Sequence, residues 1–250
     1  MNSFISWIGG KNYLKKEICN RMPADMDRYI EVFGGAAWVL FYKDKLADME
    51  VYNDANSSLV NLFKCVKYHS PELQRELGFM LNSRELFEDF KVQYKMRGMT
   101  DIQRAARFFM LIKSSYGADN RSFGCSKRDT STMVKYLDKI KDRLSKVVIE
   151  NKDFESLISV YDRPEALFYL DPPYYGTEKY YQAEFTQDNH LRLCRVLKGI
   201  HGKFILSYND CQFVKYLYSD FQIEEVSRVN NLLNRHGEGQ VYKELIIRNY

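Results

Sequence analysis

Long apolar runs are missing from this sequence, and no stretch is long enough to span a bilayer as a helix. The first ten residues also lack a basic segment followed by an apolar one, so we expect no signal peptide. Internal repeats and low-complexity linkers are absent. Hydrophobic residues make up 45% of the 250 residues, which is enough to bury a sizeable core. We therefore expect a cytoplasmic protein without a membrane partner, built as one domain or as one domain with a smaller insert.

Cysteine and histidine are few and scattered. The five cysteines form no CxxC pair, and the four histidines show no ligand spacing. This pattern argues against a disulfide framework or a zinc site and predicts free thiols in a reducing compartment. We also expect no metal site.

Positive charge is concentrated in one part of the chain. The net charge is only +4, but residues 91–148 hold 14 Lys and Arg against 5 Asp and Glu, which leaves −5 for the remainder. A local basic excess is typical of surfaces that bind nucleic acid, although many basic helices are only solvated faces.

Short apolar runs alternate with helical patterns near the start of the chain. We expect strands at 29–33 and 50–52, joined by a Gly-Gly turn and a helix over 36–46. This order favours a parallel α/β sheet. Further strands are expected at 147–150, 166–170, 203–207, 222–226 and 243–247, the last two as a closing hairpin.

The middle of the chain has a different pattern. Residues 57–146 are expected to be mainly helical, with a core-facing apolar stripe from Met133 to Leu144. The polar stretch 114–132 is long for a simple connection, and long loops are often functional. We therefore predict a catalytic domain formed by 1–56 and 147–250, with 57–146 as a helical insert.

The strongest chemical signal is Asp171-Pro172-Pro173-Tyr174, directly after an apolar strand. Strand ends of a parallel sheet point into the crevice where ligands bind. The Asp171 carboxylate and the Pro172 carbonyl offer two acceptors, which could hold both hydrogens of an exocyclic amine such as adenine N6 and direct its lone pair to a methyl donor. Tyr174 could stack on a base that has left the duplex.

Three weaker signals predict a cofactor site. Gly34-Gly35 follows a strand, and Asp54 ends the next strand, where an acid can bind ribose hydroxyls. The full GxGxxG pattern is missing, which argues against NAD. Lys11, in a Trp-Ile-Gly-Gly-Lys segment, is expected to face the cofactor. For Asp153-Phe154, a cofactor contact and an ordinary strand-end acid beside a core ring are about equally supported.

Together these segments resemble the Dam-like family, the D12 class of N6-adenine-specific DNA methyltransferases. The order matches over almost the whole chain: Trp-x-Gly-Gly-Lys, Phe-x-Gly-Gly, Asn-Asp, Asp-Phe, Asp-Pro-Pro-Tyr and a final Glu-Leu-Ile strand. The resemblance implies an S-adenosylmethionine-dependent, Rossmann-like mixed sheet whose helical insert, residues 57–146, recognises the DNA target. It implies methyl transfer to a flipped-out adenine in duplex DNA. It also implies a protein of prokaryotic or phage origin, which is a monomer or a weak dimer on DNA.

The resemblance also assigns roles to residues. The catalytic set is Asp171, Pro172, Pro173 and Tyr174. The S-adenosylmethionine contacts are Trp7, Lys11, Phe33, Gly34, Asp54, Asp153, Phe154 and Asp171. The expected DNA contacts, in or beside the stretch 114–127, are Asn120, Arg121, Lys127 and Arg128.

Other functions stay open on the sequence alone. Methyl transfer to adenine in RNA would use the same base chemistry. Enzymes that methylate glutamine or cytosine N4 have related motifs, but their first residue is usually Asn or Ser, not Asp. A catalytically silent nucleic-acid-binding protein would keep the basic insert, but the complete Asp-Pro-Pro-Tyr motif argues against it.

Overall fold

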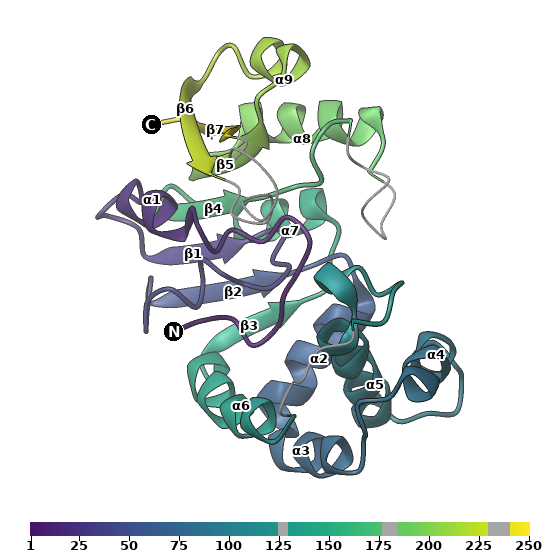
Figure 1. Cartoon of the computed structure of the whole chain (residues 1–250). Helices are drawn as coiled ribbons and strands as arrows, with labels where there is room; N and C mark the ends of the chain where they lie inside the picture. Colours follow the sequence, from purple (N-terminus) through teal and green to yellow (C-terminus); the bar gives the residue numbers. More distant parts are fainter. Residues whose placement is uncertain (125–129, 177–184, 230–240) are drawn as a thin grey trace.

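The structure is a computed structural model that describes residues 1–124, 130–176, 185–229 and 241–250. Within these ranges, seven strands form one sheet in the order β3-β2-β1-β4-β5-β7-β6 (Figure 1). The strands are β1 (Arg28–Glu31), β2 (Met49–Asn53), β3 (Val147–Glu150), β4 (Ala166–Leu170), β5 (Lys203–Asn209), β6 (Gln222–Val229) and β7 (Val241–Arg248). From β3 to β5 the neighbours are parallel, whereas β7 is antiparallel to both β5 and β6.

This arrangement confirms the predicted mixed α/β sheet and its closing hairpin. The bounds of β3 and β4 agree with prediction to the residue, and those of the other strands differ by up to three residues. β4 is buried along its whole length, because the sheet is covered on both faces.

Side chains alternate along the strands between two hydrophobic cores. In β1, Tyr29 belongs to one core and Ile30 to the other, and in β4 the same holds for Leu167 and Phe168. The helices α1 (Lys15–Asn20) and α2 (Ser57–Tyr68) contribute to the first core. The helices α7 (Phe154–Tyr161), α8 (Gln187–Gly199) and α9 (Gln212–Leu217) contribute to the second.

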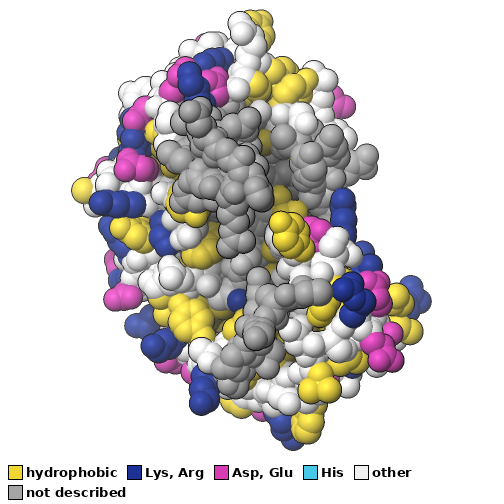
Figure 2. All heavy atoms as spheres, in the orientation of Figure 1, with side chains coloured by type: hydrophobic (Ala, Val, Ile, Leu, Met, Phe, Trp, Pro, Cys, Tyr) yellow, Lys and Arg dark blue, Asp and Glu magenta, His cyan; other side chains and the backbone are white. Residues whose placement is uncertain are grey.

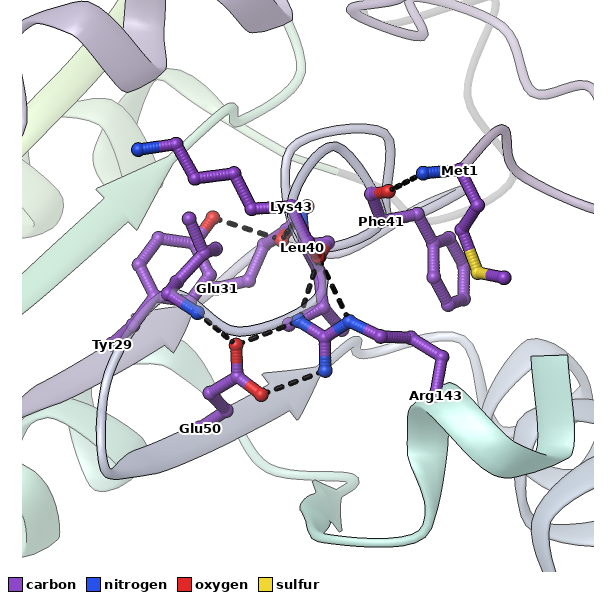
Figure 3. Close-up of polar contacts among 9 residues, drawn as sticks. Met1, Tyr29, Glu31, Leu40, Phe41, Lys43, Glu50 and Arg143 are labelled. Carbon is purple, nitrogen blue, oxygen red and sulfur yellow. Dashed lines mark hydrogen bonds and ion pairs between the residues drawn. The ribbon is translucent and has the colours of Figure 1, made fainter. Parts of the chain in front are cut away.

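The expected helix over 36–46 is wrong, because this segment forms successive turns. Its backbone groups bond to side chains from elsewhere in the chain, as Figure 3 shows. The Leu40 N–H donates to the buried Glu31 carboxylate at 3.0 Å, and the Leu40 carbonyl accepts from Arg143 at 2.8 Å. Ala37 has a φ of 55°, which no right-handed helix allows. Tertiary hydrogen bonds therefore take backbone groups that a helix would pair locally, and only single turns form, such as the one closed by the Phe41 N–H and the Ala37 carbonyl at 3.0 Å.

Between β2 and β3 the chain is mainly helical. The elements are α2, α3 (Ser70–Gly78), α4 (Arg84–Gln93), α5 (Asp101–Ser114), a 3-10 turn η1 (Tyr116–Ala118) and α6 (Thr130–Leu144). In α6, Leu137, Ile140 and Leu144 are fully buried, which confirms the core-facing stripe. The first hydrophobic core continues from the sheet into these helices, and the division into a catalytic domain and an insert stays a prediction.

Candidate active site

A pocket lies at the carboxyl ends of β1, β2 and β4, where the sequence places its motifs. Of the residues predicted to bind cofactor or substrate, seven line this pocket: Trp7, Lys11, Phe33, Gly34, Asp54, Asp171 and Pro173. Parallel strands end at the same edge of the sheet, so side chains that follow different strands meet there. The structure thus brings together segments separated by more than 150 residues.

The glycine turn after β1 is held by the acid after β2. The Gly35 N–H donates to Asp54 Oδ2 at 2.9 Å, and the Asn56 N–H donates to Oδ1 at 2.7 Å. Burial raises the pKa of Asp54, and these two backbone bonds act in the opposite direction. A carboxylate has further lone pairs, so Asp54 keeps acceptor capacity toward a ligand.

Gly34 is required at its position by close packing. A Cβ there would lie 2.2 Å from the ring of Tyr52, which no ordinary contact allows. The Tyr52 hydroxyl donates to the Gly35 carbonyl at 2.8 Å, and its ring stacks on Phe63. The turn is therefore fixed from β2 as well as from its own strand.

Lys11 and Asp171 form a buried ion pair at the pocket. Lys11 Nζ lies 2.7 Å from Asp171 Oδ1, and the two side chains are 6% and 15% exposed. The same ammonium donates to the Gly9 carbonyl at 2.8 Å and lies 4.7 Å from the ring centre of Tyr174. The N-terminal Gly-Gly-Lys segment and the Asp-Pro-Pro-Tyr motif are thus in direct contact.

Glu244, which belongs to the Glu-Leu-Ile motif but received no role from the sequence, is the partner of Tyr174. The Tyr174 hydroxyl donates to Glu244 Oε2 at 2.6 Å, and the Lys11 ammonium lies 3.8 Å from that oxygen. Burial, with the charges of Asp171 and Glu244, raises the pKa of Tyr174. The Tyr174 ring also stacks on Tyr208. The available signal was a glutamate beside three buried apolar residues in the last strand.

Glu31 is a second buried carboxyl that sequence reasoning did not select, although it lines the pocket. Its Oε2 accepts from the Tyr29 hydroxyl at 2.9 Å and from the Leu40 N–H at 3.0 Å. Burial raises the pKa of Glu31 to about 8, against the effect of these two bonds. Glu31 supports the segment that follows the glycine turn.

Asp153 and Phe154 are not among the residues that line the pocket. Asp153 caps α7 by accepting from the Glu155 N–H at 3.0 Å, and it pairs with Arg192 at 2.5 Å. The Phe154 ring packs beside Phe33, with 5.8 Å between ring centres. Phe154 therefore packs behind Phe33, which lines the pocket. The described contacts of Asp153 are to residues of α7 and α8.

The predicted DNA contacts divide into two groups. Asn120 and Arg121 lie in a turn that follows α5, with Asn120 at a φ of 57°. The Asp119 carboxylate accepts from the Arg121 N–H at 2.8 Å, and the Arg121 side chain is exposed. Lys127 and Arg128 lie outside the described residues. Figure 2 shows Lys and Arg over both the sheet part and the helical part of one face, without a single patch among the described side chains.

The geometry of this site by itself defines a class of protein. A pocket at the ends of parallel strands, with an acid after β2 and Asp-Pro-Pro-Tyr after β4, is the arrangement predicted for a methyltransferase that acts on an amine. A family model described as D12 class N6 adenine-specific DNA methyltransferase matches residues 7–232. The chain belongs to this family.

Curated relatives agree with this assignment. The type II methyltransferase M.CviBI of Paramecium bursaria Chlorella virus NC1A is 24% identical over 269 positions, which cover all of both chains. The type II methyltransferase M1.LlaDCHI of Lactococcus lactis subsp. cremoris is 25% identical over all of this chain and 96% of its own. A DNA adenine methylase of Serratia marcescens is 37% identical over 87 residues, 35% of this chain and 29% of its own.

These findings confirm the predicted family and enzyme class, an adenine-specific DNA methyltransferase. The family implies S-adenosylmethionine as methyl donor and DNA as substrate. In the part of the chain that the structure describes, no group of three or more His, Cys, Asp or Glu could hold a metal ion. None of the described helices has the length and apolar character needed to cross a membrane.

Proposed function

We propose that the protein transfers a methyl group from S-adenosylmethionine to N6 of a flipped-out adenine at a specific sequence in duplex DNA. The observation that carries this proposal is the meeting of Asp171 with Lys11 and the Gly34–Asp54 turn in one pocket. A methyl donor and its acceptor must lie side by side for direct transfer. Here, the predicted cofactor site and the predicted amine site lie in the same pocket.

The donor set of the pocket fits the chemistry of S-adenosylmethionine. Asp54 would accept from ribose hydroxyls, and Phe33 and Trp7 offer rings against which an adenine can pack. The Lys11 ammonium matches a carboxylate, and the Asp171 carboxylate matches an ammonium group. When bound, S-adenosylmethionine supplies an activated methyl group on a sulfonium.

Asp171 and Tyr174 would hold the acceptor amine. The Asp171 carboxylate and the Pro172 carbonyl accept the two N6 hydrogens, which leaves the nitrogen lone pair directed toward the methyl group. The amine would gain positive charge as its bond to the methyl group forms and the S–C bond of the sulfonium breaks, and the nearby Asp171 carboxylate would stabilise that charge until the amine loses a proton. Tyr174 stacks on the base, and its hydrogen bond to Glu244 fixes the orientation of the ring.

The turn with Asn120 and Arg121, with Lys127 and Arg128, would contact the DNA. An exposed Arg in a helical part with excess positive charge can bind phosphate or a guanine edge. An Arg121→Ala variant distinguishes the phosphate contact from the base contact. Loss of a phosphate contact weakens binding to every sequence, whereas loss of a base contact relaxes the preferred site at one position.

Methyl transfer to duplex DNA by the parent and by an Asp171→Ala variant tests the proposal. We expect the variant to lose about 2.7–4 kcal/mol of transition-state stabilisation, by analogy with removal of one oxyanion-hole donor. Asp220→Ala is a matched control, because Asp220 is an exposed acid whose partner is Lys198. Activity of Asp171→Ala within a few-fold of the control would refute the catalytic role.

Two further measurements separate the parts of the proposal. Calorimetry with S-adenosylmethionine alone should show weaker binding by Asp54→Ala, while DNA affinity is unchanged. Methyl transfer to RNA of the same sequence, in parallel with duplex DNA, tests the RNA alternative. Faster methylation of RNA than of DNA would replace the proposed substrate.

A further inference from the structure

A groove between the N-terminal segment and α6 carries basic charge that the proposed active site does not use. Its lining includes Lys113, Lys135 and Lys139, and no Asp or Glu is among the described residues that line it. Lys135 and Lys139 are exposed and stand one helical turn apart on α6, so they project from the same face. We call these three residues and the space between them the lysine groove.

The walls of the lysine groove are held in place by specific contacts. The Tyr136 hydroxyl donates to the Asn2 carbonyl at 2.7 Å and accepts from the Asn2 N–H at 3.2 Å. Phe4, on the same segment, is buried against Phe63 and Phe109. The N-terminal segment is thereby fixed beside α6, where Figure 1 shows the two side by side.

The charges of Lys135 and Lys139 are not neutralised within the described protein. Neither forms an ion pair with a described residue, whereas other exposed lysines such as Lys45 and Lys198 pair with a nearby Asp. The acid between them on α6, Asp138, bonds instead to the Gln74 side chain at 2.5 Å. Two like charges at this spacing repel in the free protein, so an anionic partner relieves an unfavourable interaction.

We propose that the lysine groove binds the phosphate backbone of the duplex DNA that carries the target adenine. This inference rests on the proposed function, in which duplex DNA is the substrate. Lysines that line one groove, with no acid among the described residues that line it, fit a polyanion, because duplex DNA carries one negative charge per about 1.7 Å of its axis. Lys113 lies one residue before the end of α5, and the 3-10 turn η1 separates it along the chain from Asn120 and Arg121.

The test is the salt dependence of DNA binding by Lys135→Gln/Lys139→Gln, with the target site and with an unrelated duplex. Loss of two phosphate contacts should reduce the slope of log affinity against log salt by about 1.8. Between 50 and 200 mM salt, the variant should therefore lose roughly 12-fold less affinity than the parent. Both duplexes should be affected alike, and the affinity for S-adenosylmethionine should not change.

Lys64→Gln/Lys141→Gln is the matched control, because both lysines are exposed, lie in the same helical part and do not line the groove. It removes the same charge, so it corrects for the effect of net charge alone. Lys135→Arg/Lys139→Arg should keep the parent slope, and thermal melting verifies that all variants are folded.

Each outcome decides the proposal. A slope equal to that of the control variant overturns the phosphate role while the proposed function stands. A loss confined to the target sequence also overturns it, since it would mean that these lysines read bases. If the parent protein binds no duplex DNA, both this proposal and the proposed substrate fail together.

Discussion

Replacing Arg143 by Met should destabilise the fold by about 3–5 kcal/mol, the typical cost of removing one partner from a buried ion pair. The Arg143 and Glu50 side chains are 6% and 5% exposed, and Nη2 of Arg143 lies 2.6 Å from Oε1 of Glu50. A second bond joins Nη1 to Oε2 at 2.7 Å (Figure 3). The pair is therefore bidentate and largely shielded from water.

The size of this destabilisation follows from the groups that lose their partner when Arg143 is replaced by Met. Glu50 would keep its bond from the Leu46 N–H at 2.9 Å but lose its counter-charge. The carbonyls of Leu40 and Lys43 would lose the guanidinium donors that now lie at 2.8 and 3.0 Å. Each buried group without a partner costs about 1–3 kcal/mol, whereas the bond to the Lys43 carbonyl is exposed, so that water can replace it there. These costs overlap within one network, so their sum is an upper bound.

Urea unfolding of four proteins measures this effect: the parent, Arg143→Met, Arg143→Lys, and Arg143→Met/Glu50→Gln. We expect Arg143→Met to be least stable, since it strands the carboxylate. The double variant should recover part of the loss because it removes the stranded charge. A change below about 1 kcal/mol for Arg143→Met, with an unchanged m-value, would show that the pair does not support the segment 36–46.

Three further predictions concern groups at the pocket. The native state holds a proton on Glu31 up to pH of about 8 because burial raises its pKa, so stability should fall as pH rises from about 4.5 to 8. Glu31→Gln should remove this fall, and superimposable urea midpoints against pH for the two proteins would contradict the prediction. Tyr174→Phe and Glu244→Gln should each lower kcat/KM, with a coupling of about 1.5–3 kcal/mol in the double variant, and additive losses would exclude the coupling. Gly34→Ala should cost about 1–3 kcal/mol by overpacking, measured as a lower Tm, whereas Gly78→Ala, with nothing within 4 Å of its Cβ position, is the control.

The strands were predictable because their signals are local. β4 is a short apolar run next to polar residues, and a buried parallel strand needs little more than that. β3 has the same kind of apolar run, although it lies at the edge of the sheet and only Val147 in it is buried. The segment 36–46 was not predictable in this way. Its apolar spacing suits a helix, but Glu31 and Arg143 take its backbone groups, and no local pattern encodes partners about 10 and 100 residues away.

The candidate site likewise contains residues that local motifs predict and a residue whose role depends on the tertiary structure. Asp171, Lys11 and Asp54 could be named from motifs, because each follows a strand or accompanies a glycine turn, and the structure brings them into one pocket. The role of Glu244 could not be named from its Glu-Leu-Ile motif, since its contact with Tyr174 exists only because β7 enters the sheet antiparallel beside β5. No local pattern in the sequence encodes the strand register that places this glutamate against Tyr174 and Lys11.

The pairing of β2 with β3 has a consequence for how the chain folds. Asn53 pairs with Glu150, so the helices from α2 to α6 form one closed loop between two adjacent strands. Closing a long unstructured loop costs entropy before the strands can gain their hydrogen bonds. Because α2 and α6 pack against one another, early association of these two helices would bring both ends of the loop together. The parallel edge of the sheet would then form late, as a product of helix docking, and mutations at the α2–α6 contact would slow folding more than mutations within β3.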